Sequence, residues 1–421
     1  MQQKSPLQLG YIKTISFFLR PPGAWPSDVF EGYLPLPIRI HRATLPFHTT
    51  IIVIGGLYYI TDNFHRLSFL DMGHMIITTF LAMVTALRSI LPNLQTYNSL
   101  LCKFLQEFHL MHHAYKGDYF EEMNKTVDKI SSYYTKFSTI IMYLGMLLFN
   151  ITPTYNNIRH TLISKTENYS MEYSVYFSYP GFNPLDHFAS TTIYNCYLSY
   201  NCSTLLCGFD LLLFLMIFQI IGHVYILRHN LENFQSPKNK ITLNLRGDAL
   251  STNNTCTYEV FDAQENEEVR LQLAECIEHH KIIIGFTDDL SGLFGPLLAF
   301  NYFFHMIACC LLLLECTEGS YDAVLRYGPL TMIVFGQLIQ MSVMFELLGS
   351  ETEKLKDSVY YLPWEAMNNS NQRTAFIMLH KMQYKISLKA LGLAAVGVNT
   401  MLGILKTTFS YYAFLQTMGD R

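Results

Sequence analysis

Charged residues are scarce in this 421-residue chain. Lys, Arg, Asp and Glu together make up 15% of it, whereas about a quarter is usual in a soluble protein, and half of the residues are apolar. The net charge of −4 leaves no basic excess for contact with a nucleic acid. The composition therefore argues against a soluble domain or a nucleic-acid-binding protein and indicates a chain surrounded by membrane lipid.

Metal-binding and catalytic motifs are also missing. The 15 histidines form no HExxH pattern, and the nine cysteines include no CxxC pair. His109, His112 and His113 follow Glu107 as the one dense histidine group, and we interpret this group as a solvated helix surface rather than as a metal site. We therefore expect no metal, no cofactor and no enzymatic activity.

Long apolar runs are what the chain does contain. A segment of about 20 mainly apolar residues crosses a bilayer as a helix, and seven segments approach or exceed that length. They predict transmembrane helices at residues 44–60, 69–91, 133–151, 190–227, 293–314, 328–348 and 390–418. The fourth is too long for a perpendicular crossing, so we expect it to tilt or to project beyond the bilayer.

Basic residues alternate between the segments that separate these spans. The N-terminal segment and the segments after the second, fourth and sixth spans carry five or six Lys or Arg residues each, and the others carry one or two. Because cytoplasmic segments hold the excess of Lys and Arg, the N-terminus should be cytoplasmic and the C-terminus extracellular. A G-protein-coupled receptor has the opposite orientation, and its Asp-Arg-Tyr and Asn-Pro-x-x-Tyr motifs are absent here.

The expected fold is an all-α membrane protein whose helices extend into a cytoplasmic region. Its parts are a cytoplasmic N-terminal segment, six helices, a second cytoplasmic segment, and a last helix with a short extracellular tail, at residues 1–43, 44–348, 349–389 and 390–421. Residues 98–129 and 266–290 read as helices below the membrane, and residues 239–258 as a disordered loop. No internal repeat is visible, which weighs against a small-molecule transporter.

The last span carries a polar stripe. One face holds Asn399, Gly403, Lys406, Ser410, Ala413 and Thr417, and the opposite face holds Leu402, Leu405, Phe409, Tyr412 and Leu415. Lipid does not favour polar side chains, so the stripe should face protein or water. Two interpretations stay open: a seam where helices approach closely, or the wall of a water-filled path between several copies of the helix.

Several short motifs point to one family. Ser358-Val-Tyr-Tyr-Leu-Pro-Trp364 follows the sixth span, then comes Gln383, and Ile404-Leu-Lys-Thr-Thr-Phe-Ser-Tyr-Tyr412 lies in the last span. Gly23-Ala-Trp-Pro26 and Glu278-His279 fit the same pattern. On these residues the chain resembles the insect odorant receptors, in particular those of moths, some of which detect pheromones. A gustatory-type receptor channel of the same superfamily is the alternative, although Thr408-Phe-Ser-Tyr departs from its usual ending.

The resemblance implies a subunit of an odorant-gated cation channel. Such receptors form heterotetramers with a shared odorant co-receptor subunit in the plasma membrane of olfactory sensory neurons. A volatile odorant or pheromone binds in the outer half of the helix bundle, and the last helix of each subunit lines a central pore. The segment at residues 349–389 then serves as the cytoplasmic anchor between subunits.

An odorant is small and apolar, so its site should be an apolar cavity with few polar groups. The outer halves of spans two, three, four and six supply the candidates for this cavity, with Asn201 and Gln337 as further polar groups. The expected ligand-binding residues are Phe69, Met75, Thr79, Tyr143, Met146, Phe149, Tyr194, Tyr197, Met332 and Phe335.

For the pore, the resemblance points to the outer end of the last helix. We expect Phe414 and Met418 to form an apolar constriction that closes by dewetting, with Ser410 and Thr417 as polar lining. A lysine at the narrow point would repel cations. We therefore expect Lys406 to turn away from it, with Asp210 or Glu346 as its partner.

Overall fold

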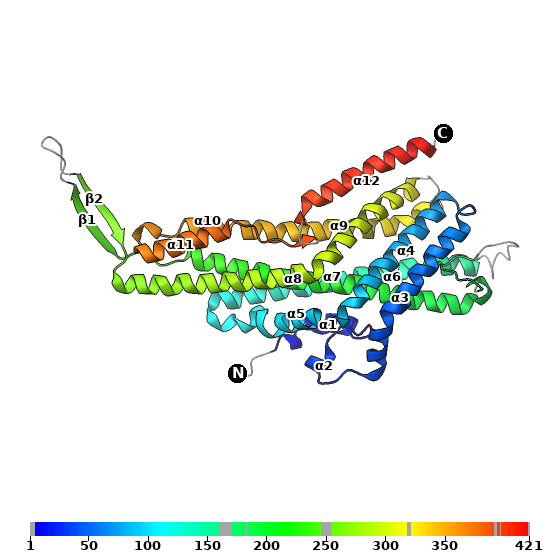
Figure 1. The fold of residues 1–421 in the computed structure, drawn as a ribbon, viewed down its shortest axis with the longest axis horizontal. Helices are drawn as coiled ribbons and strands as arrows, with labels where there is room; N and C mark the ends of the chain where they lie inside the picture. Colours follow the sequence, from blue (N-terminus) through cyan, green and yellow to red (C-terminus); the bar gives the residue numbers. More distant parts are fainter. Residues whose placement is uncertain are drawn as a thin grey trace.

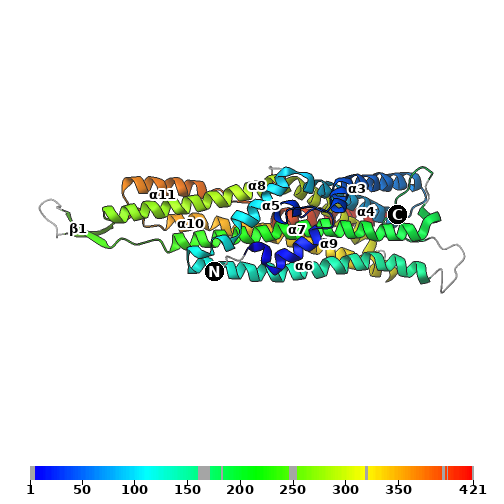
Figure 2. The same cartoon turned by 90° about the horizontal axis from the view of Figure 1, so that it is seen from below.

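The computed structural model describes residues 5–159, 171–181, 184–245, 254–317, 321–390, 394–395 and 397–419. Helices dominate these residues, and most of them run along one long axis (Figures 1 and 2). The helices are α1 (Gly10–Leu19), α2 (Ser27–Phe30), α3 (Leu36–Asn63), α4 (Phe69–Ile90), α5 (Gln95–Lys103), α6 (Asp118–Ile158), α7 (Phe188–Glu232), α8 (Ala263–Thr317), α9 (Tyr321–Glu353), α10 (Leu355–Tyr360), α11 (Asn369–Met382) and α12 (Val398–Gly419). Two antiparallel hairpins pair β1 (Asn239–Leu245) with β2 (Asn254–Val260) and β3 (Lys389–Ala390) with β4 (Ala394–Ala395).

Six helices in the described part of the chain are long and apolar enough to cross a membrane. They contain the first six predicted spans and correspond to α3, α4, α6, α7, α8 and α9. The seventh predicted span corresponds to α12, which is 22 residues long. The expected helical membrane fold is therefore confirmed, while the side of the membrane that each end faces stays a prediction.

Helix α7 forms the centre of the bundle. It contacts α1, α4, α6, α8, α9 and α10, and every side chain from Leu211 to Val224 is buried. A helix that is apolar on all sides is stable only when other helices or lipid surround it. At 1.5 Å per residue its 45 residues extend about 68 Å, so α7 is much longer than the roughly 30 Å core of a bilayer.

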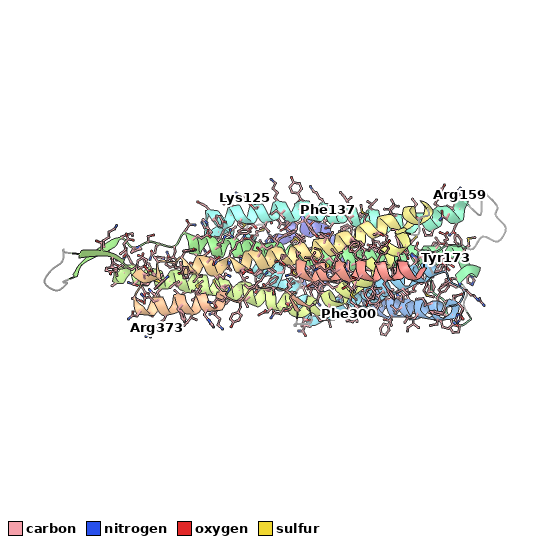
Figure 3. All side chains as sticks on the ribbon, turned by 90° about the horizontal axis from the view of Figure 1, so that it is seen from above. Lys125, Phe137, Arg159, Tyr173, Phe300 and Arg373 are labelled. Atoms are coloured by element: carbon pink, nitrogen blue, oxygen red, sulfur yellow. The ribbon has the colours of Figure 1, made fainter. Side chains whose placement is uncertain are left out.

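The long helices continue past the bundle and form a second half together with α1, α5, α10 and α11 (Figure 1). Helix α8 has Pro296 inside it, which removes one backbone hydrogen bond, and the helix bends on its way into the bundle (Figure 1). Lys125 of α6 and Arg373 of α11 lie in this second half, whereas Arg159 and Tyr173 lie at the opposite end (Figure 3). Two segments predicted to be cytoplasmic thus share one end of the molecule.

Three expectations about local structure are corrected. Residues 98–129 are not one helix, because α5 ends at Lys103 and a π-turn (Phe104–Phe108) and two 3₁₀ turns precede α6. Residues 239–258 belong to the β1–β2 hairpin rather than to a disordered loop, although 246–253 lie outside the described residues. The last helix begins at Val398 rather than near residue 390, since β3 and β4 pair ahead of it. The expected helix at residues 266–290 is confirmed as part of α8.

Candidate functional site

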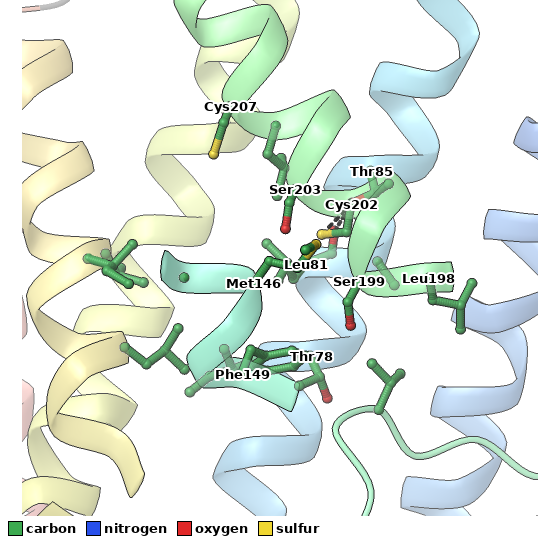
Figure 4. Close-up of a pocket in the computed structure, with 18 of the residues that line it drawn as sticks. Thr78, Leu81, Thr85, Met146, Phe149, Leu198, Ser199, Cys202, Ser203 and Cys207 are labelled. Atoms are coloured by element: carbon green, nitrogen blue, oxygen red, sulfur yellow. Dashed lines mark hydrogen bonds between the residues drawn. The ribbon is translucent and has the colours of Figure 1, made fainter. Parts of the chain in front are cut away.

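A cavity of about 150 Å³ lies inside the half of the bundle that contains the N-terminal ends of α4 and α7 (Figure 4). Helices α3, α4, α6, α7 and α9 supply most of its wall, Phe304 of α8 closes one side, and Val175 reaches in from the segment that joins α6 to α7. The residues on its wall are Thr49, Ile52, Ile77, Thr78, Leu81, Ala82, Thr85, Ile141, Met142, Gly145, Met146, Phe149, Val175, Leu198, Ser199, Cys202, Ser203, Leu206, Cys207, Phe304, Leu330, Ile333, Val334 and Gln337.

Most hydroxyl groups on this wall are already hydrogen-bonded. The side-chain oxygens of Thr49, Thr78 and Thr85 donate to backbone carbonyls one turn earlier in their own helices, at 2.9, 3.0 and 2.8 Å. Ser199 donates to Oδ1 of Asn150 at 3.2 Å. Because these groups are occupied, the wall presents mainly methyl and methylene groups to a ligand, as a site for a small apolar molecule requires.

Small side chains on α7 create the space. Ser199, Cys202, Ser203 and Cys207 lie on the face of α7 that turns toward the cavity (Figure 4). Cys202 also accepts a hydrogen bond from the hydroxyl of Thr85 at 3.2 Å, which links α7 to α4. Gly145 on α6 presents no side chain to the cavity at all, and its missing Cβ would lie 3.4 Å from Cδ1 of Ile333. The cavity therefore exists where large side chains are absent from facing helices.

Residues 171–181 cover the end of the cavity near Phe149, and Val175 from this segment is on the wall. Asn157 holds this segment through two hydrogen bonds to the backbone of Glu172, at 2.7 and 2.8 Å. The backbone of Ser178 donates to the carbonyl of Gly55, and the hydroxyl of Tyr179 donates to that of Ile51. A Cβ at Gly55 would lie 2.6 Å from the Tyr179 ring, so glycine permits this close approach of α3 and the covering segment.

The structure brings two of the expected ligand-binding residues to the cavity wall, Met146 and Phe149, together with Gln337. Met75 is buried elsewhere, and Thr79 lies beside Gly56 on α3. Phe335 packs against the core instead, and the Met332 side chain is 78% exposed. The side chain of Phe69 lies outside the described residues.

The expected tyrosines contact other aromatic rings. Tyr143 meets Phe18 edge-on, with 5.7 Å between the ring centroids. Tyr194 and Tyr197 stack on one another at 5.9 Å, and the hydroxyl of Tyr197 lies 2.7 Å from Nε2 of His41. None of the three is on the cavity wall. Sequence reasoning favoured large aromatic side chains and missed the small residues of α7, whose spacing of three and four positions marks one helical face.

Among the described helices that could cross a membrane, α12 packs mainly against α8 and α9, and it leaves one side open (Figure 1). Ile404 and Thr408 are buried, while Leu402, Ser410 and Phe414 are exposed. The expected pore residues Ser410 and Phe414 thus lie on the outer side of the single chain. The side chains of Thr417 and Met418 lie outside the described residues.

The expected partners of Lys406 are engaged elsewhere. Oδ1 of Asp210 lies 2.8 Å from Nη2 of Arg88, and Oε1 of Glu346 lies 3.5 Å from Nζ of Lys385. Lys406 itself is exposed on α12. The prediction that either carboxylate pairs with Lys406 is therefore wrong for the single chain, because each has a nearer cation.

The histidine group around His109 is not the solvated helix surface that we expected. His109 is fully buried: its Nδ1 accepts a hydrogen bond from the backbone of Met111, and its Nε2 lies 2.8 Å from the hydroxyl of Tyr11. That hydroxyl donates in turn to Asp128. Burial lowers the pKa of His109 to about 3. The interpretation of this group as a solvated surface is thus wrong for His109. The described residues contain no group of His, Cys, Asp and Glu side chains that could hold a metal ion.

The fold and the cavity together define a multi-pass helical membrane protein with an apolar cavity inside its helix bundle. The family model described as 7tm Odorant receptor matches residues 68–409, and the chain belongs to that family. The resemblance drawn from the short motifs is therefore confirmed. The family is one of receptors.

Individual relatives match over shorter stretches. Odorant receptor 85a of Drosophila melanogaster is 23% identical over 152 residues, which make up 35% of this chain and 37% of that receptor. Odorant receptor 42a of the same species is 24% identical over 166 residues, or 38% and 39% of the two chains. The matched stretch spans about two fifths of the length of these curated relatives.

The whole fold is similar to that of a solved receptor. The insect olfactory receptor OR5 from Machilis hrabei superimposes with a TM-score of 0.73 at 14% sequence identity, over 96% of this chain and 97% of that one. The structure of OR5 in complex with eugenol gives a TM-score of 0.72 at 15% identity, over 97% and 98% of the two chains. This likeness establishes the common fold.

Proposed function

We propose that this chain is an odorant receptor subunit of a heteromeric ligand-gated cation channel. A small, apolar, volatile molecule binds in the cavity between α3, α4, α6, α7 and α9, and binding opens a pore lined by α12. The observation that carries the proposal is the cavity itself, since it is apolar, internal and covered by the segment after α6. The capture of eugenol by OR5, a receptor of the same fold, supports an odorant as its ligand.

Helix α9 connects the cavity to the pore helix. Ile333, Val334 and Gln337 are on the cavity wall, and further along α9 contacts α12. Oε2 of Glu346 on α9 accepts a hydrogen bond from the backbone of Val398, the first residue of α12, at 3.3 Å. A ligand that displaces α9 therefore also moves the start of α12, which gives the gate a direct mechanical link to the binding site.

The open side of α12 supports assembly around a central pore. Leu402 and Phe409 are exposed there next to Ser410 and Lys406, so the expected separation into a polar and an opposite apolar face is wrong. This mixture favours contact with neighbouring subunits and a water-filled path over contact with lipid alone. We propose that the partners are a shared odorant co-receptor subunit and that residues 349–389 hold the subunits together on the cytoplasmic side. The complex lies in the plasma membrane of olfactory sensory neurons.

Filling the cavity tests the proposal. The variant Gly145→Trp should abolish odorant-evoked currents in cells that also express the co-receptor, because the indole occupies the space next to Ile333. Met332→Trp is the matched control, since this side chain is exposed on α9 and should leave the currents intact. Surface labelling must find both variants at the membrane. Unchanged odorant responses in the filled variant would rule out this cavity as the site, and a requirement for GTP would rule out a directly gated channel.

A further inference from the structure

A second, smaller cavity adjoins the first. It encloses about 40 Å³ between α6, α7 and α9, which is room for one or two groups of the size of a water molecule. The two cavities share Ile141, Cys207 and Gln337 as wall residues. Cys207 lies at the end of the large cavity that is far from Thr78 and Phe149 (Figure 4), so the small cavity continues the large one at its deep end.

The wall of the small cavity is mainly apolar, but five side chains on it can form hydrogen bonds. Tyr134 and Ser138 of α6, Asp210 of α7, and Gln337 and Gln340 of α9 contribute to its wall. The hydroxyl of Tyr134 is buried and interacts with Ser138 one turn further along α6 without a hydrogen bond of good geometry. The two glutamine amides form no hydrogen bond within the described chain, and their spacing of three residues places both on one face of α9. These polar groups are available to a bound molecule.

The charge in this cavity is already compensated. Nη2 of Arg88 lies 2.8 Å from Oδ1 of Asp210, and Nη1 of Arg88 donates to the carbonyl of Leu206 at 2.6 Å. A cationic ligand would therefore compete with a buried arginine, and an anionic ligand would meet the carboxylate. A carboxylate oxygen can only accept a hydrogen bond, whereas a glutamine amide both donates and accepts. The wall thus favours a neutral group that can donate as well as accept.

We propose that the ligand is a neutral alcohol whose apolar chain or ring fills the large cavity and whose hydroxyl lies in the small one. The hydroxyl donates to the side-chain oxygen of Asp210 or Gln337 and accepts from a glutamine amide. The inference rests on the proposed function, because it names the chemical class of ligand for that same site. Gln337 is then the residue that determines specificity, since it belongs to both cavities.

Hydrogen-bonding sites discriminate strongly against analogues that lack the matching group. An ether of the same size has no donor, and a hydrocarbon has neither donor nor acceptor, so each leaves buried polar groups without partners. An aldehyde or ester can accept from the glutamine amides but cannot donate to Asp210. We therefore expect alcohols to be the most potent class, with ethers and hydrocarbons of equal length the weakest.

The test compares straight-chain primary alcohols with methyl ethers of the same number of heavy atoms, by current recording in cells that co-express the co-receptor. The alcohols should reach half-maximal response at concentrations lower by roughly tenfold or more. Gln337→Leu and Tyr134→Phe should reduce this potency ratio several-fold. The control Ile333→Val lies on the same helix and touches only the large cavity, so it should shift the preferred chain length and keep the ratio.

The outcomes separate this inference from the proposed function. If no volatile compound evokes a current, or if Gly145→Trp leaves the evoked currents unchanged, the proposed function fails. If odorants evoke currents that Gly145→Trp abolishes, but alcohols and ethers are equally potent, only the alcohol inference fails. The potency ratio of alcohols to ethers is measured on the wild-type protein, so the proposal is tested even if Gln337→Leu is poorly expressed. A clear alcohol preference that Gln337→Leu and Tyr134→Phe both leave unchanged also overturns it.

Discussion

The two halves of α7 behave differently although one continuous helix forms both. Between Leu215 and Val224 most side chains are large and apolar, all are buried, and none is on the wall of either cavity. Between Leu198 and Cys207 the helix carries serine and cysteine at the positions that face α4, α6 and α9, and a cavity remains. Side-chain size, rather than helix position, therefore decides where this fold has room for a ligand.

The boundary between the halves is an ion pair, and breaking it should have the largest effect on stability. Arg88→Ala leaves the carboxylate of Asp210 inside the bundle without its partner, which should cost about 3–5 kcal/mol. The loss would appear as a lower unfolding temperature of the detergent-solubilised protein in fluorescence-detected size exclusion.

A double variant provides the control for this pair. Arg88→Met combined with Asp210→Leu removes both charges and should recover most of the lost stability, because no unpaired charge remains. If the single Arg88 variant were as stable as the wild type, the pair would not hold the two halves together.

The same substitution placed in each half sharpens the comparison. A Cβ at Gly222, in the filled half, would lie 2.5 Å from Cδ1 of Leu110 and 2.9 Å from Cγ2 of Val127, so Gly222→Ala should cost about 1–3 kcal/mol. Gly145→Ala borders the cavity, where its nearest neighbour would be 3.4 Å away, and should leave stability nearly unchanged. Thermal unfolding of the two variants side by side measures the difference. Equal losses would mean that the cavity half is packed as tightly as the filled half.

The membrane spans could be predicted because apolarity over 20 residues is a local property. The true helix ends could not always be predicted, since contacts between segments determine them: α12 begins at Val398 rather than near residue 390, because β3 and β4 pair ahead of it. The β1–β2 hairpin was missed although threonine and other β-branched residues alternate in it, because its polar composition suggested disorder.

The cavity residues were harder to predict than the spans. Aromatic side chains are numerous, and most predicted candidates were aromatic. The rings of Tyr143, Tyr194 and Tyr197 pack against other aromatic rings and are not on the cavity wall. The informative signal was the small residues Ser199 and Cys202, because short side chains leave space unfilled between helices. Only the packing of four other helices around them shows that the space stays open, and such long-range packing is not readable from one helix.

Acid should destabilise the filled half of the bundle, and we expect this loss of stability to be smaller than the losses in Arg88→Ala and Gly222→Ala. His109 lies in its core, and burial lowers its pKa to about 3, whereas an exposed histidine titrates near 6.5. Below pH 6.5 the unfolded chain therefore binds a proton that the folded chain does not, and stability falls as the pH falls. From pH 7.5 to 5.5 the loss should be about 1.4 kcal/mol for this residue.

Thermal unfolding across that pH range measures the effect, and two glutamine variants isolate it. His109→Gln removes the titrating ring from the core and should flatten the dependence on pH by that amount, although its bonds to Met111 and Tyr11 are weakened at every pH. His112→Gln is the control. His112 lies three residues further along, in the 3₁₀ turn that His109 precedes, and it is less buried. Equal slopes in the wild type and in His109→Gln would mean that protonation of His109 does not open the filled half, and the contrast between the two halves would then rest on side-chain packing alone.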